Sequence, residues 1–120
     1  MLKDVTDFVK KYELPTFESP SLNKPILDIR IAHLQEELAE LIDAAEADDE
    51  VEVVDALLDL VYIALGTCVM LGFDTQAHWN EIQRANMSKV KGVTKRGHNV
   101  DVKKPDGWVG PQHERIINGS

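Results

Sequence analysis

The stretch HLQEELAELIDAAEADDEVEVVDALLDLVY, residues 33–62, decides the fold that we expect for this chain. It contains eleven carboxylates and neither lysine nor arginine. Apolar residues recur through it at the spacing of an α-helix. The segment ADDE (47–50) interrupts this pattern with acidic residues that commonly cap a helix. The stretch therefore predicts two helices joined by a short turn.

The same periodicity extends the prediction to the rest of the chain. Helices are predicted at about residues 1–14, 26–47, 49–71 and 75–90. Three prolines indicate a linker at 15–25, and glycines, prolines and alternating charges after residue 92 indicate an irregular basic tail. Within that tail only VTKRGHNVDV (93–102) has the pattern of a β-hairpin. The fold class predicted is all-α.

The helix predicted at 49–71 is apolar nearly all round from Val53 to Leu71. A helix of this kind is buried on most of its sides. A single chain offers only two other long helices to cover it. We therefore expect a helical bundle that is completed by oligomerisation, as a homodimer or a homotetramer.

The charge distribution limits the partners of the chain. Its formal net charge is −8, which argues against nucleic acid as a partner. Residues 1–83 hold 5 basic and 18 acidic side chains, whereas residues 84–120 hold 8 basic and 3 acidic ones. The single Cys68 excludes an internal disulfide and suits a reducing cytoplasm. No signal-peptide pattern is present, and the apolar run 60–73 is too short to span a bilayer, so no membrane partner is expected.

The carboxylates of the deciding stretch form two helical stripes. Glu36 and Glu40 are four residues apart and share one helix face, with Glu37 about 100° round from Glu36. Glu52, Asp55 and Asp59 form a second stripe at i, i+3 and i+7. Two helices joined by a short turn pack antiparallel, so the two stripes can face each other. The alternative for EELAEL alone is a solvent-exposed helix face.

Carboxylates on a mostly buried helix need a partner, because burying an unpaired charge costs roughly several kcal/mol of folding free energy. No lysine or arginine occurs between Ile31 and Gln83. Protonation could relieve one or two of the acids, but a set of five needs a cation. Oxygen ligands without cysteine favour Mg²⁺, Mn²⁺ or Ca²⁺, and Mg²⁺ commonly shares its shell with substrate phosphates. We therefore expect Mg²⁺, for which Mn²⁺ could substitute, and a phosphorylated ligand.

At this point the sequence resembles a known family. The pattern Glu-Glu-x-x-Glu followed by Glu-x-x-Asp, here EELAE (36–40) and EVVD (52–55), is similar to the MazG-like all-α nucleoside triphosphate pyrophosphohydrolases. QRANMSKV, near the end of the last predicted helix, adds to the likeness. The resemblance covers about residues 5–91. It implies a pyrophosphohydrolase-like domain at 1–91, with 92–120 as a tail of the same domain or one that docks on a neighbouring subunit.

The resemblance also implies a reaction and a set of site residues. The reaction is Mg²⁺-dependent hydrolysis of a nucleoside triphosphate, expected to be a deoxynucleoside triphosphate, to the monophosphate and pyrophosphate. By position in the motifs, the metal-binding carboxylates would be Glu36, Glu37, Glu40, Glu52 and Asp55. Glu37 is our choice for the catalytic group that activates water. Asn86 and Lys89 match positions that contact the nucleotide.

Two other functions remain compatible with the sequence. The chain could be a non-enzymatic helical oligomerisation or binding module, in which the acids form a solvated face. It could also be a divalent-ion-binding regulator without turnover. Loss of activity on substitution of the acids would separate the enzyme from both. Trp108, in the tail, could stack on a base or pack against a neighbouring subunit.

Overall fold

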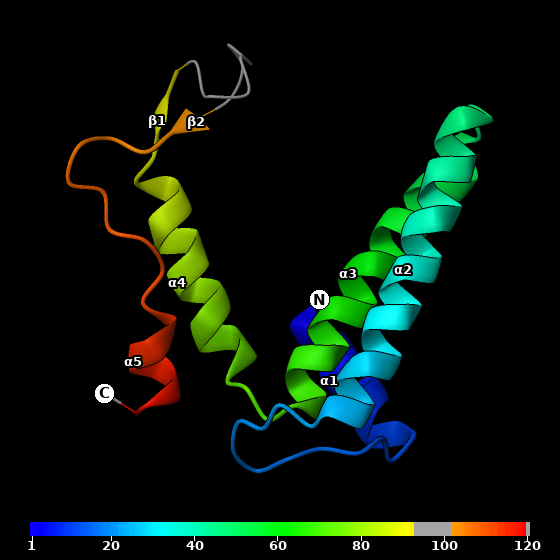
Figure 1. Cartoon of the computed structure of the whole chain (residues 1–120), viewed down its shortest axis with the longest axis horizontal. Coiled ribbons are helices and arrows are strands. Elements are labelled where there is room, and N and C mark those ends of the chain that lie inside the picture. The colour runs from blue at the N-terminus through cyan, green and yellow to red at the C-terminus, as the bar shows by residue number, and fades with distance from the viewer. Residues whose placement is uncertain (93–101, 120) are drawn as a thin grey trace. The chain divides into compact units, whose positions relative to one another are not determined.

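The computed structural model describes residues 1–92 and 102–119, and it contains two compact units, Met1–Thr75 and Gln76–Ser120 (Figure 1). Helices account for most of the described residues, and the only strands among them form one short pair. The predicted all-α fold class is confirmed. In chain order the elements are α1 (Leu2–Lys11), α2 (Lys24–Glu46), α3 (Glu50–Met70), α4 (Thr75–Met87), β1 (Val90–Lys91), β2 (Val102–Lys103) and α5 (His113–Ile117).

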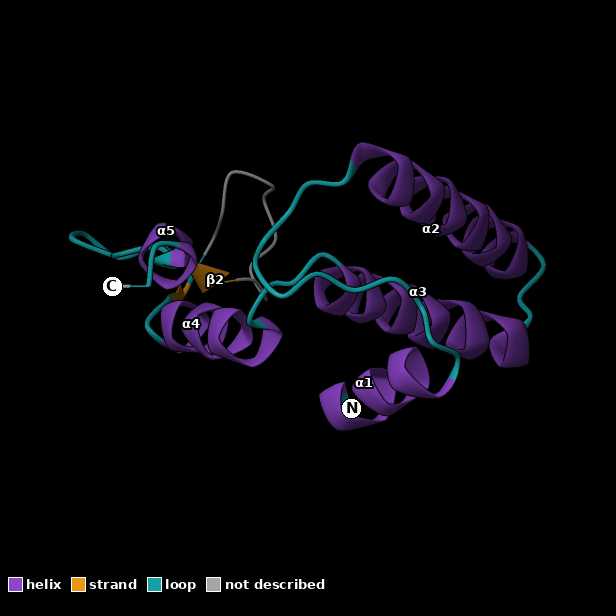
Figure 2. Ribbon diagram, turned by 90° about the horizontal axis from the view of Figure 1, so that it is seen from below, coloured by secondary structure: helices purple, strands orange, loops and turns teal. Residues whose placement is uncertain are grey.

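In the first unit, α3 lies between α1 and α2 and contacts both (Figure 2). The buried apolar residues of these helices include Val5 and Val9 of α1 and Ala56 and Ile63 of α3. Arg30 connects α2 to α3: its Nε donates to Thr67 Oγ1 at 3.0 Å, and its Nη2 donates to the Ile63 carbonyl at 3.1 Å. Thus α2 and α3 are held by a polar contact as well as by apolar packing.

The turn between α2 and α3 matches the sequence prediction. Asp49 is the N-cap of α3, and its side chain accepts a hydrogen bond from the Glu52 backbone N–H at 3.2 Å. Asp48 has a positive φ of 52°, a conformation that aspartate and asparagine tolerate better than most residues. The turn brings α3 back along α2, which is the arrangement that the carboxylate stripes require.

The end of α3 is fixed by the linker that precedes α2. The backbone N–H groups of Phe17 and Ser21 donate to the carbonyls of Met70 and Leu71 at 3.2 and 2.9 Å. Gly72 has a φ of +79°, and a Cβ there would lie 2.5 Å from the Ser19 carbonyl oxygen. The linker can approach this closely only because residue 72 has no side chain.

We expect Gly72→Ala to lower the free energy of unfolding by about 3 kcal/mol, since a left-handed conformation and a clash with backbone add together. Gly107→Ala is the matched control, because Gly107 has a φ of +74° and no atom within 4 Å of its Cβ position. It should cost only about 1 kcal/mol. Urea denaturation followed by circular dichroism measures both. Equal losses would show that the contact with Ser19 can relax freely.

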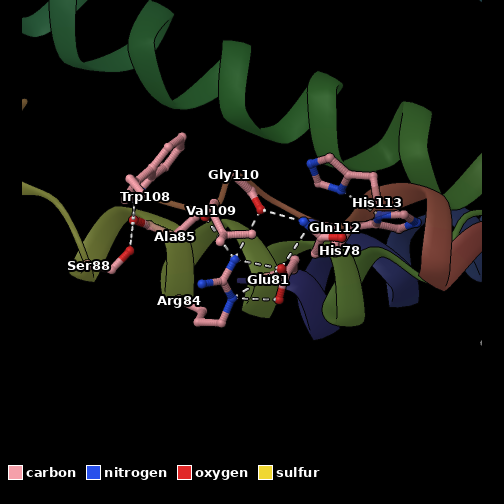
Figure 3. A network of polar contacts seen from close by, with 10 residues as sticks. All are labelled: His78, Glu81, Arg84, Ala85, Ser88, Trp108, Val109, Gly110, Gln112 and His113. Atoms are coloured by element: carbon pink, nitrogen blue, oxygen red, sulfur yellow. Dashed lines mark hydrogen bonds and ion pairs between the residues drawn. The ribbon is translucent and has the colours of Figure 1, made fainter. Parts of the chain in front are cut away.

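In the second unit, the described C-terminal segment lies along α4 (Figure 3). Arg84 forms an ion pair with Glu81 at 2.8 Å and donates from Nη2 to the carbonyls of Val109 and Gly110 at 3.2 and 3.1 Å. Glu81 also accepts the Gln112 backbone N–H at 2.9 Å. These bonds lower the pKa of Glu81, first through Arg84 and then through Gln112. The alternative that the tail docks on a neighbouring subunit stays a prediction.

Some predicted boundaries differ from the structure. The helix predicted at 75–90 ends at Met87, where the chain turns and Ser88 Oγ donates to the Ala85 carbonyl at 2.7 Å before β1 begins. The first helix ends at Lys11 rather than residue 14, and Glu13 has a positive φ of 52°. A hairpin was predicted at 93–102, of which residues 93–101 lie outside the described part of the chain. On either side of these residues, Lys91 of β1 pairs antiparallel with Val102 of β2.

The surface of α3 that faces away from α1 and α2 exposes many large apolar side chains. Glu50–Met70 is long and apolar enough to cross a membrane by length and composition, and 22% of its most apolar 18-residue window is buried. This helix extends further than the apolar run 60–73 on which the sequence argument relied. The exposed apolar residues of one face are spaced at i, i+3, i+7 and i+10, namely Val51, Val54, Leu58 and Val61.

Candidate active site

The carboxylates predicted to bind metal lie on α2 and α3 of the first unit. Glu37 is half-buried, and so is Asp59 on α3. The other predicted ligands are exposed in this structure: Glu36, Glu40, Glu52 and Asp55. The cluster therefore has a half-buried centre, Glu37 and Asp59, with exposed acids around it.

Glu37 has the most perturbed environment of these acids. Its Oε2 atom is buried and has no hydrogen-bond partner among the described residues. Burial raises the pKa of the Glu37 carboxyl, and Glu40 raises it further by its charge and by hydrogen bonding. Asp59 and Glu36 add smaller electrostatic increases. The structure thus brings together acids from both helices, with Asp59 of α3 acting on Glu37 of α2.

The structure places Asp59, the last acid of the second stripe, within electrostatic reach of Glu37. Glu52 and Asp55 are absent from the groups that shift the pKa of Glu37. Both lie nearer to the start of α3, where Glu52 N–H is engaged in the cap with Asp49. The roles of the five predicted ligands stay predictions.

An unpartnered buried carboxylate oxygen is a feature that a bound cation would explain. The donors around it are hard oxygen atoms, which suit Mg²⁺ or Mn²⁺. Within residues 1–92 and 102–119, no three Asp, Glu, His or Cys side chains are arranged closely enough to hold a metal ion. Glu36, Glu40 and Asp55 are exposed, so packing does not fix the positions of their carboxylates. The chemistry of the donor set fits a divalent ion.

Arg30 lies on α2, six residues before the first acidic motif. In the structure its guanidinium binds α3 through Thr67 and Ile63. Burial lowers the pKa of Arg30. Gly66 makes room for it, since a Cβ at that position would lie 3.0 Å from Arg30 Nη2. The basic residue closest in sequence to the acidic motif is thus used to join the helices.

Asn86 and Lys89, the predicted nucleotide contacts, lie in the second unit at and just after the end of α4. Asn86 is exposed. Lys89 is half-buried, with its Nζ 5.4 Å from the centroid of the Trp108 ring. Lys89 therefore lies beside Trp108, a proximity that the sequence did not indicate.

The sequence matches the family described as phosphoribosyl-ATP pyrophosphohydrolase over residues 6–86. The chain belongs to this family. It is thereby a member of the MazG-like all-α nucleoside triphosphate pyrophosphohydrolase superfamily, which confirms the resemblance found in the sequence. No individual curated protein matches the chain.

The family match covers the predicted metal-binding carboxylates but not all of the predicted nucleotide contacts. It includes both acidic motifs and ends at Asn86, so Lys89 and the whole C-terminal segment lie beyond it. Membership of the phosphoribosyl-ATP pyrophosphohydrolase family identifies the protein as a pyrophosphohydrolase of nucleotide-like substrates.

Proposed function

We propose that this protein hydrolyses a nucleoside triphosphate to the nucleoside monophosphate and pyrophosphate in a Mg²⁺-dependent reaction. The observation that carries the proposal is the unpartnered Oε2 atom of Glu37, surrounded by acids of α2 and α3. The family match supports the reaction class. Mn²⁺ is expected to substitute for Mg²⁺, because both are bound by oxygen ligands.

In this proposal Glu36, Glu37, Glu40, Glu52 and Asp55 hold the metal, and Asp59 orients them from α3. Bound Mg²⁺ would supply charge stabilisation for the phosphoryl oxygens and lower the pKa of water. Glu37 orients the attacking water and accepts its proton. The water oxygen forms a bond to phosphorus as the P–O bond to pyrophosphate breaks in line with it. Asn86 and Lys89 contact the nucleotide and its phosphates.

The preferred substrate in this proposal is a deoxynucleoside triphosphate. A second candidate, phosphoribosyl-ATP, is favoured by the family that matches residues 6–86. The two share the 5′-triphosphate at which the reaction occurs, so the same carboxylates serve either. They differ at the base and its substituents, and the contacts to these groups determine which is used.

We further propose that the chain acts in the cytoplasm as a homodimer or homotetramer, without nucleic acid or membrane partners. The exposed apolar face of α3 supports self-association, since a second copy would remove it from water. Asp55 and Asp59 interrupt this apolar helix, and acidic residues are costly within lipid.

The test is a panel of deoxynucleoside and ribonucleoside triphosphates and phosphoribosyl-ATP, with Mg²⁺, with Mn²⁺ and with EDTA, and with the products separated by chromatography. We expect equal amounts of monophosphate and pyrophosphate with either metal, and at least a hundredfold lower rate in EDTA. Release of single phosphates would indicate a different bond, and turnover in EDTA would remove the metal from the mechanism. Absence of any turnover would favour a binding module.

A further inference from the structure

Trp108 is held against the end of α4 although it lies in an irregular segment. Its Nε1 donates a hydrogen bond of 2.8 Å to the carbonyl of Ala85 (Figure 3). The bonds from Arg84 to the carbonyls of Val109 and Gly110 fix the residues that follow. The indole is half-buried, so its position is determined while part of its surface remains open to solvent.

Two ammonium groups lie beside this indole. The Nζ atom of Lys104 is 5.0 Å from the ring centroid, and that of Lys89 is 5.4 Å from it. Both distances are within the range of cation–π attraction. Across residues 1–92 and 102–119, no carboxylate forms an ion pair with either lysine. Two positive charges are therefore gathered at one aromatic ring, and neither is neutralised by an ion pair within the described part of the chain.

An anion with several negative charges would stabilise the two ammonium groups more strongly than the indole ring does. Charge-assisted hydrogen bonds to phosphate are stronger than the attraction of an exposed lysine to an indole. When the ammonium groups move to phosphate oxygens, the indole is free to stack on a base. A long polyanion such as RNA is disfavoured, because the chain as a whole carries a net charge of −8.

We propose that Lys89, Lys104 and Trp108 form a binding site for the nucleotide, in which the lysines bind its phosphates and the indole stacks on its base. The proposal rests on the proposed function for the identity of the ligand. It assigns roles to Lys104 and Trp108, which lie outside the part of the chain that the family match covers. It also gives the basic C-terminal segment a role in binding the nucleotide.

The first experiment measures binding without turnover, with the full chain in EDTA. Trp79 is replaced by phenylalanine so that Trp108 is the only fluorophore of its kind. Fluorescence is titrated with a deoxynucleoside triphosphate, with inorganic tripolyphosphate and with the free nucleoside. We expect quenching in the order nucleotide, tripolyphosphate, nucleoside. Equal affinity for nucleotide and tripolyphosphate would overturn the stacking role of Trp108. Calorimetry on the parent chain repeats the comparison without the Trp79 substitution.

The second experiment removes one charge at a time. Lys104→Gln should weaken nucleotide binding about tenfold and raise KM by a similar factor, with kcat changed less than about twofold, since the interaction forms in the bound ground state. Lys103→Gln is the matched control, because Lys103 is the adjacent lysine and its side chain instead packs over Gly92. It should change affinity less than about twofold.

Equal effects of Lys104→Gln and Lys103→Gln would overturn the site and leave only a general effect of charge. The result is distinguishable from failure of the proposed function, which would appear as a parent chain that releases no pyrophosphate. If Lys104-dependent binding persists in such a chain, the nucleotide site stands and the hydrolase assignment does not. If hydrolysis occurs but binding is insensitive to Lys104, the hydrolase assignment stands and the proposed nucleotide site does not.

Discussion

Glu37→Gln is expected to reduce the rate of pyrophosphate release by about a thousandfold or more, because the substitution removes both a metal ligand and the group that accepts the proton from water. Glutamine has nearly the same shape, so the packing of α2 against α3 should be retained. The rate is measured at saturating nucleotide and Mg²⁺. A variant that retains the parent rate would contradict the role of Glu37, and with it the centre of the proposed site.

The same substitution should stabilise the metal-free protein at neutral pH. The pKa of Glu37 is raised in the folded state, chiefly by burial and then by Glu40. The stabilising contribution of its protonated form is therefore fully present below the ordinary pKa of a glutamate and is lost as the pH rises through the raised value. In EDTA the parent should lose thermal stability over this window, and Glu37→Gln should lose less. The melting temperature as a function of pH tests this.

Asp48→Asn is the matched control for both measurements. It also removes one negative charge, but from the turn between α2 and α3, and asparagine tolerates the positive φ of this residue. Activity and the pH profile should remain close to those of the parent. A large loss of activity in this variant would mean that the site extends to the turn.

The sequence contained most of the information needed to place α2, α3 and their turn. The acidic segment 47–50 was predicted to cap a helix, and Asp49 does so for α3 because its side chain accepts the otherwise unpaired Glu52 backbone N–H. Helical spacing predicted two acidic stripes, of which the structure brings Asp59 of α3 within electrostatic reach of Glu37 of α2. The smaller effect of Asp59 on the pKa of Glu37 could not be predicted, because it depends on which residues of α2 and α3 lie opposite each other when the two helices pack.

Other features depend on contacts between residues distant in sequence. Arg30 bonds to Thr67, a partner 37 positions away that no helical spacing indicates. Trp108 meets Lys89 because its indole N–H reaches the end of α4, and neither residue has a neighbour in sequence that signals the other. The sequence predicted that α3 is apolar on nearly all sides. It does not contain the contacts that a second molecule would make with the exposed side.

Leu58→Glu is expected to convert the proposed homo-oligomer into a monomer. Leu58 is 59% exposed in the single chain and lies in the apolar stripe of α3. In a symmetric interface the substitution is made in both copies, and losing two buried leucines costs about 4 kcal/mol, which raises the dissociation constant by roughly a thousandfold. Sedimentation of parent and variant at micromolar concentration measures the change.

Leu22→Glu is the control for this substitution, because Leu22 is 66% exposed but lies in the linker before α2 rather than on α3. It should leave the assembly intact, since it makes the same change of polarity away from the stripe. A monomeric parent would contradict the proposed oligomer. If the parent is monomeric and also sediments with lipid vesicles, a membrane covers α3 instead, and Leu58→Glu should then release the protein from the vesicles.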